Sequence, residues 1–399
     1  MDKLVTKFEN KNVLIWGYGV EGKSSEKFLY KYCNPKSVEV YEGKRDNLPM
    51  DDYDIVIKSP GVPYFNYTED KITSMTQLFL EEFRDRTVGI TGTKGKSTTT
   101  GMLYHVLSQN LNKKVCLLGN IGIPCLEAYE DMKNGAVAVY EMSCHQLANN
   151  TVSPHVAVFL NLYEDHLDYY KTKENYFEAK AHITRFQTQS DLFYKGSSVP
   201  EIDTQANVIT LEDFSENRFE LNVLGSHNQW NAQVAYQIAV DNFGCDPQKV
   251  KNSLKTFVGL SHRLEKFATI SNVSYFDDSI STIPEATINA IESIPDCRTV
   301  VVGGMDRGID YDILIDYIKL HKEVNFVLCY ASGRRIYDSV SECANSFYED
   351  DLTKATEKAR ELTESGSVVL SPAAASYGYF KNFEERGDFF KSCVLSKRK

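Results

Sequence analysis

Short apolar runs alternate with longer amphipathic stretches along most of the chain. Near its start, strand-like runs at residues 13–16, 38–42 and 54–61 surround a stretch at 23–32 whose apolar positions recur with helical spacing. Runs of this length between turn residues are typical of strands, and the longer stretch is typical of a connecting helix. The pattern therefore predicts a parallel sheet whose strands are joined by helices.

The central part of the chain repeats this alternation. A short apolar strand begins at residue 88, and a helix is expected at 97–107. Residues 190–222 show little periodicity, so we expect a short β-rich or looping segment there. Further strands are predicted at 114–118, 136–147 and 156–162, and further helices at 175–182 and 224–239.

The last part of the chain begins with a turn and an extended run at 257–265, which we interpret as a hinge. A third set of alternating elements follows and predicts a second doubly wound α/β sheet. Its strands are expected at 273–276, 298–302, 325–328 and 367–370, and its helices at 285–292, 312–321 and 352–362.

The length of 399 residues exceeds what one ordinary hydrophobic core supports, so several domains are expected. We predict an α/β protein with three of them. Residues 1–86 form an N-terminal Rossmann-like sheet, residues 87–259 a central sheet like that of P-loop ATPases, and residues 260–399 a C-terminal, doubly wound Rossmann-like sheet.

Composition excludes several classes of protein. The chain is 42% hydrophobic, as in globular proteins, and its net charge of −11 offers no general attraction to nucleic acid. No apolar run approaches a membrane span, and the first residues lack the apolar core of a signal peptide. The nine cysteines form no Cys-x-x-Cys pair, which favours reduced thiols over disulfides or zinc. We expect a cytoplasmic protein that does not insert into membranes and acts as a monomer.

A glycine-rich turn at residues 92–98 joins the strand from residue 88 to the helix after it. Backbone N–H groups of such a turn converge on an anion at the positive end of the helix. Strict Walker spacing would need glycine where Ile90 stands, and a lysine-capped turn is the alternative, but the strand and helix favour a phosphate site. The expected nucleotide contacts are Gly92, Thr93, Lys94, Gly95, Lys96, Ser97 and Thr98.

Carboxylates follow two of the central strands. The strand at 136–147 delivers Glu141 and Ser143, and the next strand leads to Glu164, Asp165 and His166. Because carboxyl ends of parallel strands gather at one sheet edge, these groups suggest magnesium beside the phosphate loop. Capping of the following helix is an equally good interpretation of Glu164 and Asp165. Histidine is also an unusual ligand for a cation as hard as magnesium.

A second glycine turn, with Gly17, Gly19 and Gly22, follows the first strand, and Glu42 ends the next. This is the fingerprint of a dinucleotide-binding fold, although a structural turn is as good an interpretation. A dehydrogenase would also need hydride-transfer machinery, and the phosphate loop follows instead. In the last domain, loops at 277–282, 303–307 and 371–376 follow predicted strands and should share one face.

With these residues identified, the chain resembles the Mur ligases over nearly its whole length. The last motif, residues 371–387, is similar to the MurD branch, whose members add D-glutamate to UDP-N-acetylmuramoyl-L-alanine. The earlier motifs would also suit other Mur ligases or folylpolyglutamate synthetases. The ordered motifs begin at Thr91, Gly119, Glu141, Asn161, His227, Gly259 and Ser371.

The resemblance implies an ATP-dependent amide ligase of peptidoglycan precursor synthesis. In such ligases the terminal phosphate of ATP moves to a carboxylate, and an amine then displaces phosphate from the acyl phosphate. Positioning and charge neutralisation do most of this work. We favour D-glutamate as the amine. The alternatives are L-glutamate, another amino acid, or a folylpolyglutamate-type reaction.

The resemblance also implies roles for individual residues. Lys180, which alone would be only a surface lysine, matches the lysine that is carbamylated in the family and so becomes a ligand for magnesium. The catalytic set is then Lys96, Glu141, His166, Lys180 and Arg263, and the metal set Ser97, Glu141, His166 and Lys180. Further implied contacts are Asn231, Arg263 and Asp278 for ATP, Asn120 and Ser143 near the acyl group, Gly17, Gly19, Gly22 and Glu42 for the uridine diphosphate, and Thr282, Arg307, Ser376 and Phe383 on the glutamate side.

Two positions depart from the family pattern. Ile280 stands in a loop where most of the MurD branch carries a lysine, and Arg307 stands where some members have lysine. The second change keeps the charge but alters its reach. The enantiomer of glutamate therefore stays open at this point. A nucleotide-dependent switch is the remaining alternative, but a switch would not need an amino-acid site.

Overall fold

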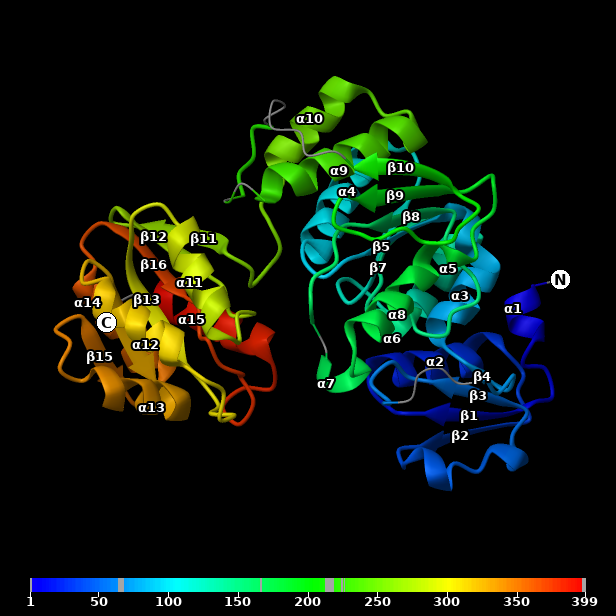
Figure 1. Cartoon of the computed structure of the whole chain (residues 1–399), viewed down its shortest axis with the longest axis horizontal. Coiled ribbons are helices and arrows are strands. Elements are labelled where there is room, and N and C mark those ends of the chain that lie inside the picture. Colours follow the sequence, from blue (N-terminus) through cyan, green and yellow to red (C-terminus); the bar gives the residue numbers. More distant parts are fainter. Residues whose placement is uncertain are drawn as a thin grey trace. The chain divides into compact units, whose positions relative to one another are not determined.

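The structure is a computed structural model that describes residues 2–63, 68–165, 167–211, 219–223, 225 and 227–396. It contains three sheets, and the chain divides into two compact units. The first unit comprises Met1–Glu220 and His227–Lys255, and the second comprises Leu221–Ser226 and Thr256–Lys399 (Figure 1). The predicted α/β class with largely parallel sheets is confirmed.

The N-terminal sheet has four strands in the order β2-β1-β3-β4, and all its pairs are parallel. Helix α2 begins at Val20 rather than at residue 23, because the glycine turn leads directly into it. The strands are β1 (Asn12–Trp16), β2 (Ser37–Tyr41), β3 (Ile55–Lys58) and β4 (Ile72–Thr73), and the helices are α1 (Lys3–Thr6) and α2 (Val20–Tyr32).

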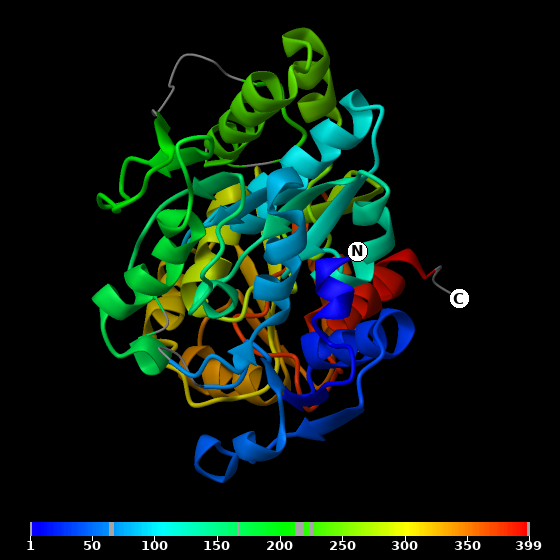
Figure 2. The same cartoon turned by 90° about the vertical axis from the view of Figure 1, so that its right-hand side faces the viewer.

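The central sheet has six parallel strands in the order β10-β9-β8-β5-β7-β6. The strands are β5 (Thr87–Thr91), β6 (Val115–Gly119), β7 (Val137–Glu141), β8 (Val156–Phe159), β9 (Leu192–Gly196) and β10 (Asn207–Leu211). Its helices are α3 (Met75–Phe83), α4 (Lys96–Asn110), α5 (Tyr129–Lys133), α6 (Cys144–Leu147), α7 (Leu167–Tyr170), α8 (Lys173–Arg185), α9 (His227–Phe243) and α10 (Pro247–Thr256). Helices α4 and α9 pack side by side, as both views show (Figures 1 and 2).

One expectation for this sheet was wrong. The strand expected at 136–147 ends at Glu141, and Cys144–Leu147 forms the short helix α6, because Ser143 and Gln146 make a capping box that starts a helix there. The segment at 190–222, expected to be β-rich or looping, contributes β9 and β10, so the β-rich alternative is confirmed, and both strands extend the sheet in parallel register.

The N-terminal and central sheets share one hydrophobic cluster of buried residues. Phe28 of α2 packs edge-on against Tyr129 of α5, with ring centroids 5.1 Å apart, and Phe79 of α3 packs on Tyr140 of β7 at 5.8 Å. Such burial of aromatic area is a main source of stability. The two sheets therefore stand on a common core, and the domain limit at residue 86 remains a prediction.

The second unit has one six-stranded sheet in the order β11-β12-β16-β13-β14-β15, in which only β11 pairs antiparallel with its neighbour. One hydrophobic cluster lies under α11, α12 and α13 and another under α14 and α15, which fits the expected doubly wound sheet. The strands are β11 (Glu265–Ile270), β12 (Val273–Asp277), β13 (Cys297–Gly303), β14 (Asn325–Cys329), β15 (Ser346–Glu349) and β16 (Gly366–Leu370). The helices are α11 (Pro284–Ser293), α12 (Asp312–Leu320), α13 (Tyr330–Val340), α14 (Leu352–Leu362) and α15 (Phe383–Leu395).

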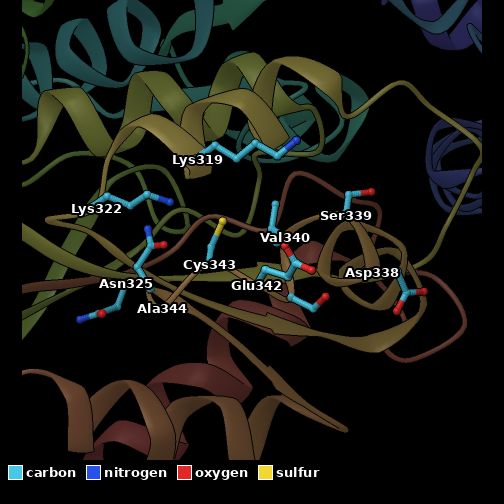
Figure 3. Close-up of a pocket in the computed structure, with 11 residues that line it drawn as sticks. Lys319, Lys322, Asn325, Asp338, Ser339, Val340, Glu342, Cys343 and Ala344 are labelled. Carbon is cyan, nitrogen blue, oxygen red and sulfur yellow. The ribbon is translucent and has the colours of Figure 1, made fainter.

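A cavity of about 700 Å³ opens at the amino-terminal edge of this sheet (Figure 3). Lys319 and Lys322 reach it from the end of α12, Asn325 from the start of β14, and Cys343 from the turn before β15. Ligands of open α/β sheets gather at the opposite, carboxyl edge. The cavity therefore lies away from the loops expected to form a site.

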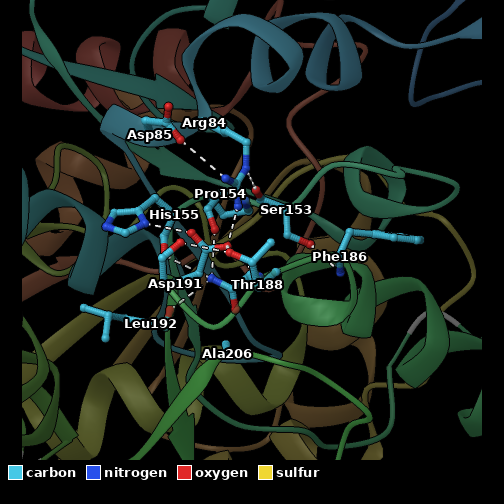
Figure 4. Close-up of polar contacts among 12 residues, drawn as sticks. Arg84, Asp85, Ser153, Pro154, His155, Phe186, Thr188, Asp191, Leu192 and Ala206 are labelled. Carbon is cyan, nitrogen blue, oxygen red and sulfur yellow. Dashed lines mark hydrogen bonds and ion pairs between the residues drawn. The ribbon is translucent and has the colours of Figure 1, made fainter.

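A buried carboxylate ties three segments together at the amino-terminal edge of the central sheet (Figure 4). Asp191, which is fully buried, accepts hydrogen bonds from Arg84 Nη2 at 2.6 Å and from the backbone N–H of Thr188 at 2.7 Å, and contacts His155 Nδ1 at 2.8 Å. Burial alone would raise the pKa of Asp191, but these bonds and the charge of Arg84 hold it below its usual value. The network is structural, since it lies far along the strands from the phosphate loop.

All nine cysteines are free thiols, as expected. In the part of the chain that the structure describes, no helix is both long and apolar enough to cross a membrane.

Candidate functional site

Strand β5 runs into a glycine loop that starts helix α4. Gly92 and Gly95 have φ angles of +157° and +81°, which fall in the region that favours glycine, and a Cβ at Gly95 would lie 2.8 Å from Asn231 Oδ1. Gly95 caps the 15-residue α4 without a side-chain bond, so the first amides of the helix remain available to an anion. The loop has the form expected for a phosphate site.

The loop is held in shape by side chains around it. Asn161, just beyond β8, accepts hydrogen bonds at its Oδ1 from the N–H groups of Thr93 at 3.1 Å and Lys94 at 2.8 Å. Lys96 donates from Nζ to the carbonyl oxygen of Thr93 at 3.1 Å, so its ammonium group lies over the loop. This arrangement directs both backbone dipoles and one side-chain charge at the same small region.

Asn231 lies in α9 and is 3% exposed. Its Oδ1 accepts from Thr99 Oγ1 at 3.1 Å, and its Nδ2 donates to Asn228 Oδ1 at 3.0 Å. These bonds attach α9 to α4 just behind the phosphate loop. The expected contact of Asn231 with ATP stays a prediction, because the described bonds already occupy both ends of its amide.

Lys180 is 1% exposed on α8, so its interpretation as a surface lysine is wrong. Its Nζ donates to the carbonyl oxygen of Gly92 at 2.8 Å and lies 4.8 Å from the centre of the Tyr176 ring. Burial, with the nearby charge of Lys96, lowers the pKa of Lys180 to about 7. Near neutral pH a large fraction of this amine is uncharged, and the uncharged amine is the nucleophilic form.

The expected magnesium ligands lie around the same loop as far as the structure describes them. Glu141 ends β7, opposite Ile90 of β5, and is 2% exposed. Ser97 is buried in the first turn of α4, and Thr98 is half-buried beside it. These oxygen donors suit a hard cation. His166 lies outside the described residues.

Ser143 and Asn120 follow the strands β7 and β6. Ser143 caps α6, with its Oγ accepting from the N–H of Gln146 at 3.2 Å, while Asn120 is exposed. Gln146 in turn donates from Nε2 to Glu21 Oε1 of α2 at 2.7 Å. Burial raises the pKa of Glu21 to about 7, against opposing effects of Gln146 and Lys58. No local pattern indicated this contact, which joins residues 125 positions apart.

The structure explains why two positions of the N-terminal glycine turn are occupied by glycine. Gly17 has φ +90°, and a Cβ at Gly22 would lie 2.2 Å from the carbonyl oxygen of Gly17, because α2 packs closely on the turn. Gly19 precedes α2 with open space around it, and Glu42 is exposed after β2. The expected contacts of these residues with a uridine diphosphate remain predictions.

In the second unit, three loops meet at the carboxyl ends of the neighbouring strands β12, β16 and β13. Ser371 Oγ donates to Asp278 Oδ2 at 2.9 Å, which links the loops after β16 and β12, and the N–H of Met305 donates to the carbonyl oxygen of Ala375 at 2.8 Å, which links those after β13 and β16. Burial raises the pKa of Asp278 to about 6. The three loops thus form one face, as the strand pattern indicated.

The remaining residues expected in this unit lie on or near that face. Ser376 is buried, and Phe383 begins α15 half-buried. Arg307 is exposed after β13, while Thr282 and Ile280 are half-buried after β12. Arg263 is half-buried in the segment that precedes β11, and its contact with ATP stays a prediction.

One cluster among the described residues has metal-ligand spacing, namely His262, Glu265 and Asp277. Lys391 places its Nζ 2.6 Å from Glu265 Oε2 and 3.4 Å from Asp277 Oδ2, and His262 Nδ1 lies 2.7 Å from Asp277 Oδ2. An ammonium group therefore already neutralises the carboxylates, and the cluster is an ion-pair network.

Comparison with known proteins supports one family. Residues 90–196 match the model of the Mur ligase middle domain. The chain is 31% identical to a UDP-N-acetylmuramoylalanine–D-glutamate ligase of Lactobacillus johnsonii, over 97% of this chain and 98% of that protein. It is 32% identical to a ligase of the same name from Aquifex aeolicus, over 96% of this chain and 98% of the relative.

Solved structures agree in fold. The UDP-N-acetylmuramate-alanine ligase of Thermotoga maritima superposes with a TM-score of 0.60 at 19% identity, covering 97% of this chain and 100% of that one. The MurF ligase of Thermotoga maritima in complex with ADP gives a TM-score of 0.59 at 17% identity, with 99% of each chain covered.

Proposed function

The chain belongs to the Mur ligase family, and from this premise we propose that it is an ATP-dependent ligase joining D-glutamate to UDP-N-acetylmuramoyl-L-alanine in peptidoglycan precursor synthesis. The observation that carries the proposal is the glycine loop at Gly92–Gly95 with Lys180 buried against it. A loop of this form binds phosphates. A lysine buried beside it, with a lowered pKa, is typical of a residue with a functional role.

The reaction has two covalent steps. A carboxylate oxygen of the muramoyl-linked alanine attacks the γ-phosphorus of ATP, a new O–P bond forms, and ADP leaves with the electrons of the broken bond. The amine of D-glutamate then attacks the acyl carbon, phosphate leaves with its electron pair, and the nitrogen loses a proton. The product is an amide, ADP and phosphate.

The phosphate loop supports the first step by neutralising charge. Lys96 exchanges its bond to the Thr93 carbonyl for one to the transferring phosphate, and the amides at the start of α4 face the same oxygens. Ser97 and Glu141 would hold magnesium through their oxygen atoms, and the cation would neutralise charge on the phosphates. His166 is proposed as a further ligand on the family resemblance alone.

Lys180 is proposed to carry a carbamate. Its uncharged Nζ attacks the carbon of CO2, an N–C bond forms, one C=O electron pair moves onto oxygen, and Nζ releases a proton. The pKa of about 7 supports this step because the amine is substantially uncharged at neutral pH. The product is a carboxylate that stands next to Gly92 and can take part in binding magnesium.

The three loops of the second unit are proposed to bind glutamate. Arg307 holds the α-carboxylate bidentately, and Ser376 with the backbone at Phe383 holds the side-chain carboxylate. Aspartate is one methylene shorter and cannot engage both groups, so glutamate is preferred by at least about tenfold. Because the reaction consumes ATP, we also propose that the protein works in the cytoplasm.

The test is phosphate release from ATP in the presence of UDP-N-acetylmuramoyl-L-alanine, with D-glutamate, L-glutamate and D-aspartate supplied separately and the product mass measured. D-glutamate is expected to give the amide product. Product from L-glutamate alone would overturn the choice of enantiomer and leave the ligase mechanism standing. If none of the three amino acids gave product, the proposed substrates would be wrong.

A further inference from the structure

Arg386 lies in the first turns of α15 and is 1% exposed, which makes it one of the largest fully buried side chains in the described part of the chain. Arginine is rarely buried to this extent without a paired charge. No role for Arg386 follows from the sequence pattern.

The guanidinium group of Arg386 bonds to two of the three loops of the proposed glutamate face and lies close to the third. Its Nε donates to Ser279 Oγ at 3.0 Å and its Nη2 to the carbonyl oxygen of Ser279 at 2.7 Å, both in the loop after β12. Its Nη1 donates to the carbonyl oxygen of Ala374, after β16, at 2.9 Å. A Cβ on Gly304, after β13, would lie 2.9 Å from the same Nη1. One side chain thus joins the loops after β12 and β16 and packs close to the loop after β13.

Through Ser279, the hydrogen bonds of Arg386 extend to a residue that is expected to bind glutamate. Ser279 Oγ, which accepts from Arg386, donates in turn to the carbonyl oxygen of Phe383 at 2.7 Å. Arg386 therefore controls where the backbone at Phe383 lies without touching the surface itself.

Within the described residues, the guanidinium group of Arg386 hydrogen-bonds to neutral groups alone. Among the described residues, no carboxylate lies within ion-pair distance of its guanidinium, and its bonds go to two carbonyl oxygens and one hydroxyl. Asp277, which acts on it electrostatically, is already paired with Lys391 and in contact with His262. A buried cation that bonds to neutral groups still acts electrostatically on the groups around it, and the bonds of Arg386 place its charge against the loop face.

We propose that Arg386 is a positioning residue of the glutamate site, and that its buried charge supplies the preference for a dicarboxylic amino acid that Ile280 cannot supply. This inference rests on the proposed function. It explains how the loop after β12 serves an anionic substrate although Ile280 is apolar.

The experiment uses the full chain with Arg386→Met, Arg386→Lys and Ser279→Ala. The control is Arg298→Met, which removes an exposed arginine of the same unit that pairs with Asp296 at the opposite edge of the sheet. Values of KM for D-glutamate, ATP and UDP-N-acetylmuramoyl-L-alanine are measured, together with kcat/KM for D-glutamate relative to D-glutamine.

Arg386→Met should raise KM for D-glutamate at least about tenfold, change the KM for ATP less than about twofold, and reduce the preference for D-glutamate over D-glutamine about tenfold. Arg386→Lys keeps the charge but not the forked geometry, so it should raise KM for D-glutamate and keep the preference. Ser279→Ala should behave like Arg386→Lys, and Arg298→Met like the unaltered protein.

The inference is overturned if Arg386→Lys and Ser279→Ala raise all three KM values together, since that is the signature of a purely structural role. It is also overturned if a folded Arg386→Met variant keeps its preference for D-glutamate. Should Arg386→Met fail to fold, Arg386→Lys and Ser279→Ala decide. Failure of the unaltered protein to use D-glutamate would instead refute the proposed function, before any variant is compared.

Discussion

The ammonium nitrogen of Lys180 lies 2.8 Å from the carbonyl oxygen of Gly92, the first residue of the phosphate loop. Helix α8 thus brings a lysine to a position where burial, and secondarily the nearby charge of Lys96, disfavours its charged form. The pKa of Lys180 is low because of where its side chain lies. The uncharged amine that results is the form that can react with CO2 to give a carbamate.

Replacing Lys96 by alanine should reduce ligation by about a hundredfold to a thousandfold, because the transferring phosphate loses a charge-assisted contact. Phosphate release under saturating substrates is the measurement. Lys113→Ala, which removes an exposed lysine elsewhere in the first unit, is the matched control and should leave the rate unchanged. A Lys96→Ala variant with more than about a tenth of the activity would refute the role of the loop.

Lys180→Ala should be nearly inactive, and short-chain carboxylic acids such as acetate should restore part of the rate by supplying the missing oxygen ligand. Acetate should have no such effect on Lys96→Ala. Full activity of Lys180→Ala without additives would show that no carbamate is needed.

The carbamate itself should be visible by carbon-13 NMR after addition of labelled bicarbonate. Because burial lowers the pKa of Lys180 to about 7, its amine is uncharged above that pH, and the signal should grow as pH rises from about 6 to 8. Lys180→Ala should lack the signal. A signal of equal size in both proteins would assign the carbamate to another amine.

Asp191→Asn should lower the free energy of unfolding by about 1–3 kcal/mol at pH 7, because it removes a charge-assisted bond to Arg84, which is a quarter exposed and keeps its contact with Asp85. Since the folded-state pKa of Asp191 is depressed, its contribution is present above the unfolded value of about 4 and is lost as pH falls below it. Urea unfolding at pH 7 and at pH 3.5 measures both effects. Asp85→Asn, which alters an exposed carboxylate also in contact with Arg84, should change stability by less than about 1 kcal/mol.

Local pattern predicted the elements well wherever buried positions recur regularly. The helix expected at 352–362 matches α14 because Leu352, Ala355 and Ala359 repeat on the face that packs on the sheet. The bounds of strand β9 were not predicted, because Lys195 interrupts its apolar run. In the fold that lysine is buried, with its Nζ donating to the carbonyl oxygen of Val199.

The local sequence pattern could not predict that two charged side chains are buried. Lys180 and Arg386 occupy helical positions where a charged side chain ordinarily faces water. Their partners lie far along the chain, at Gly92 for Lys180 and at Ser279 for Arg386, 88 and 107 residues away. Burial of this kind is decided by tertiary packing, which no local periodicity encodes.

The common hydrophobic cluster of the N-terminal and central sheets makes them one cooperative melting unit. Neither sheet can unfold without exposing apolar side chains of the other, whereas the second unit has clusters of its own. Calorimetry should therefore resolve two heat-absorption peaks from a protein with three sheets. A fragment cut after residue 86 would carry part of the cluster, including Phe28 and Phe79, into water and would aggregate on expression.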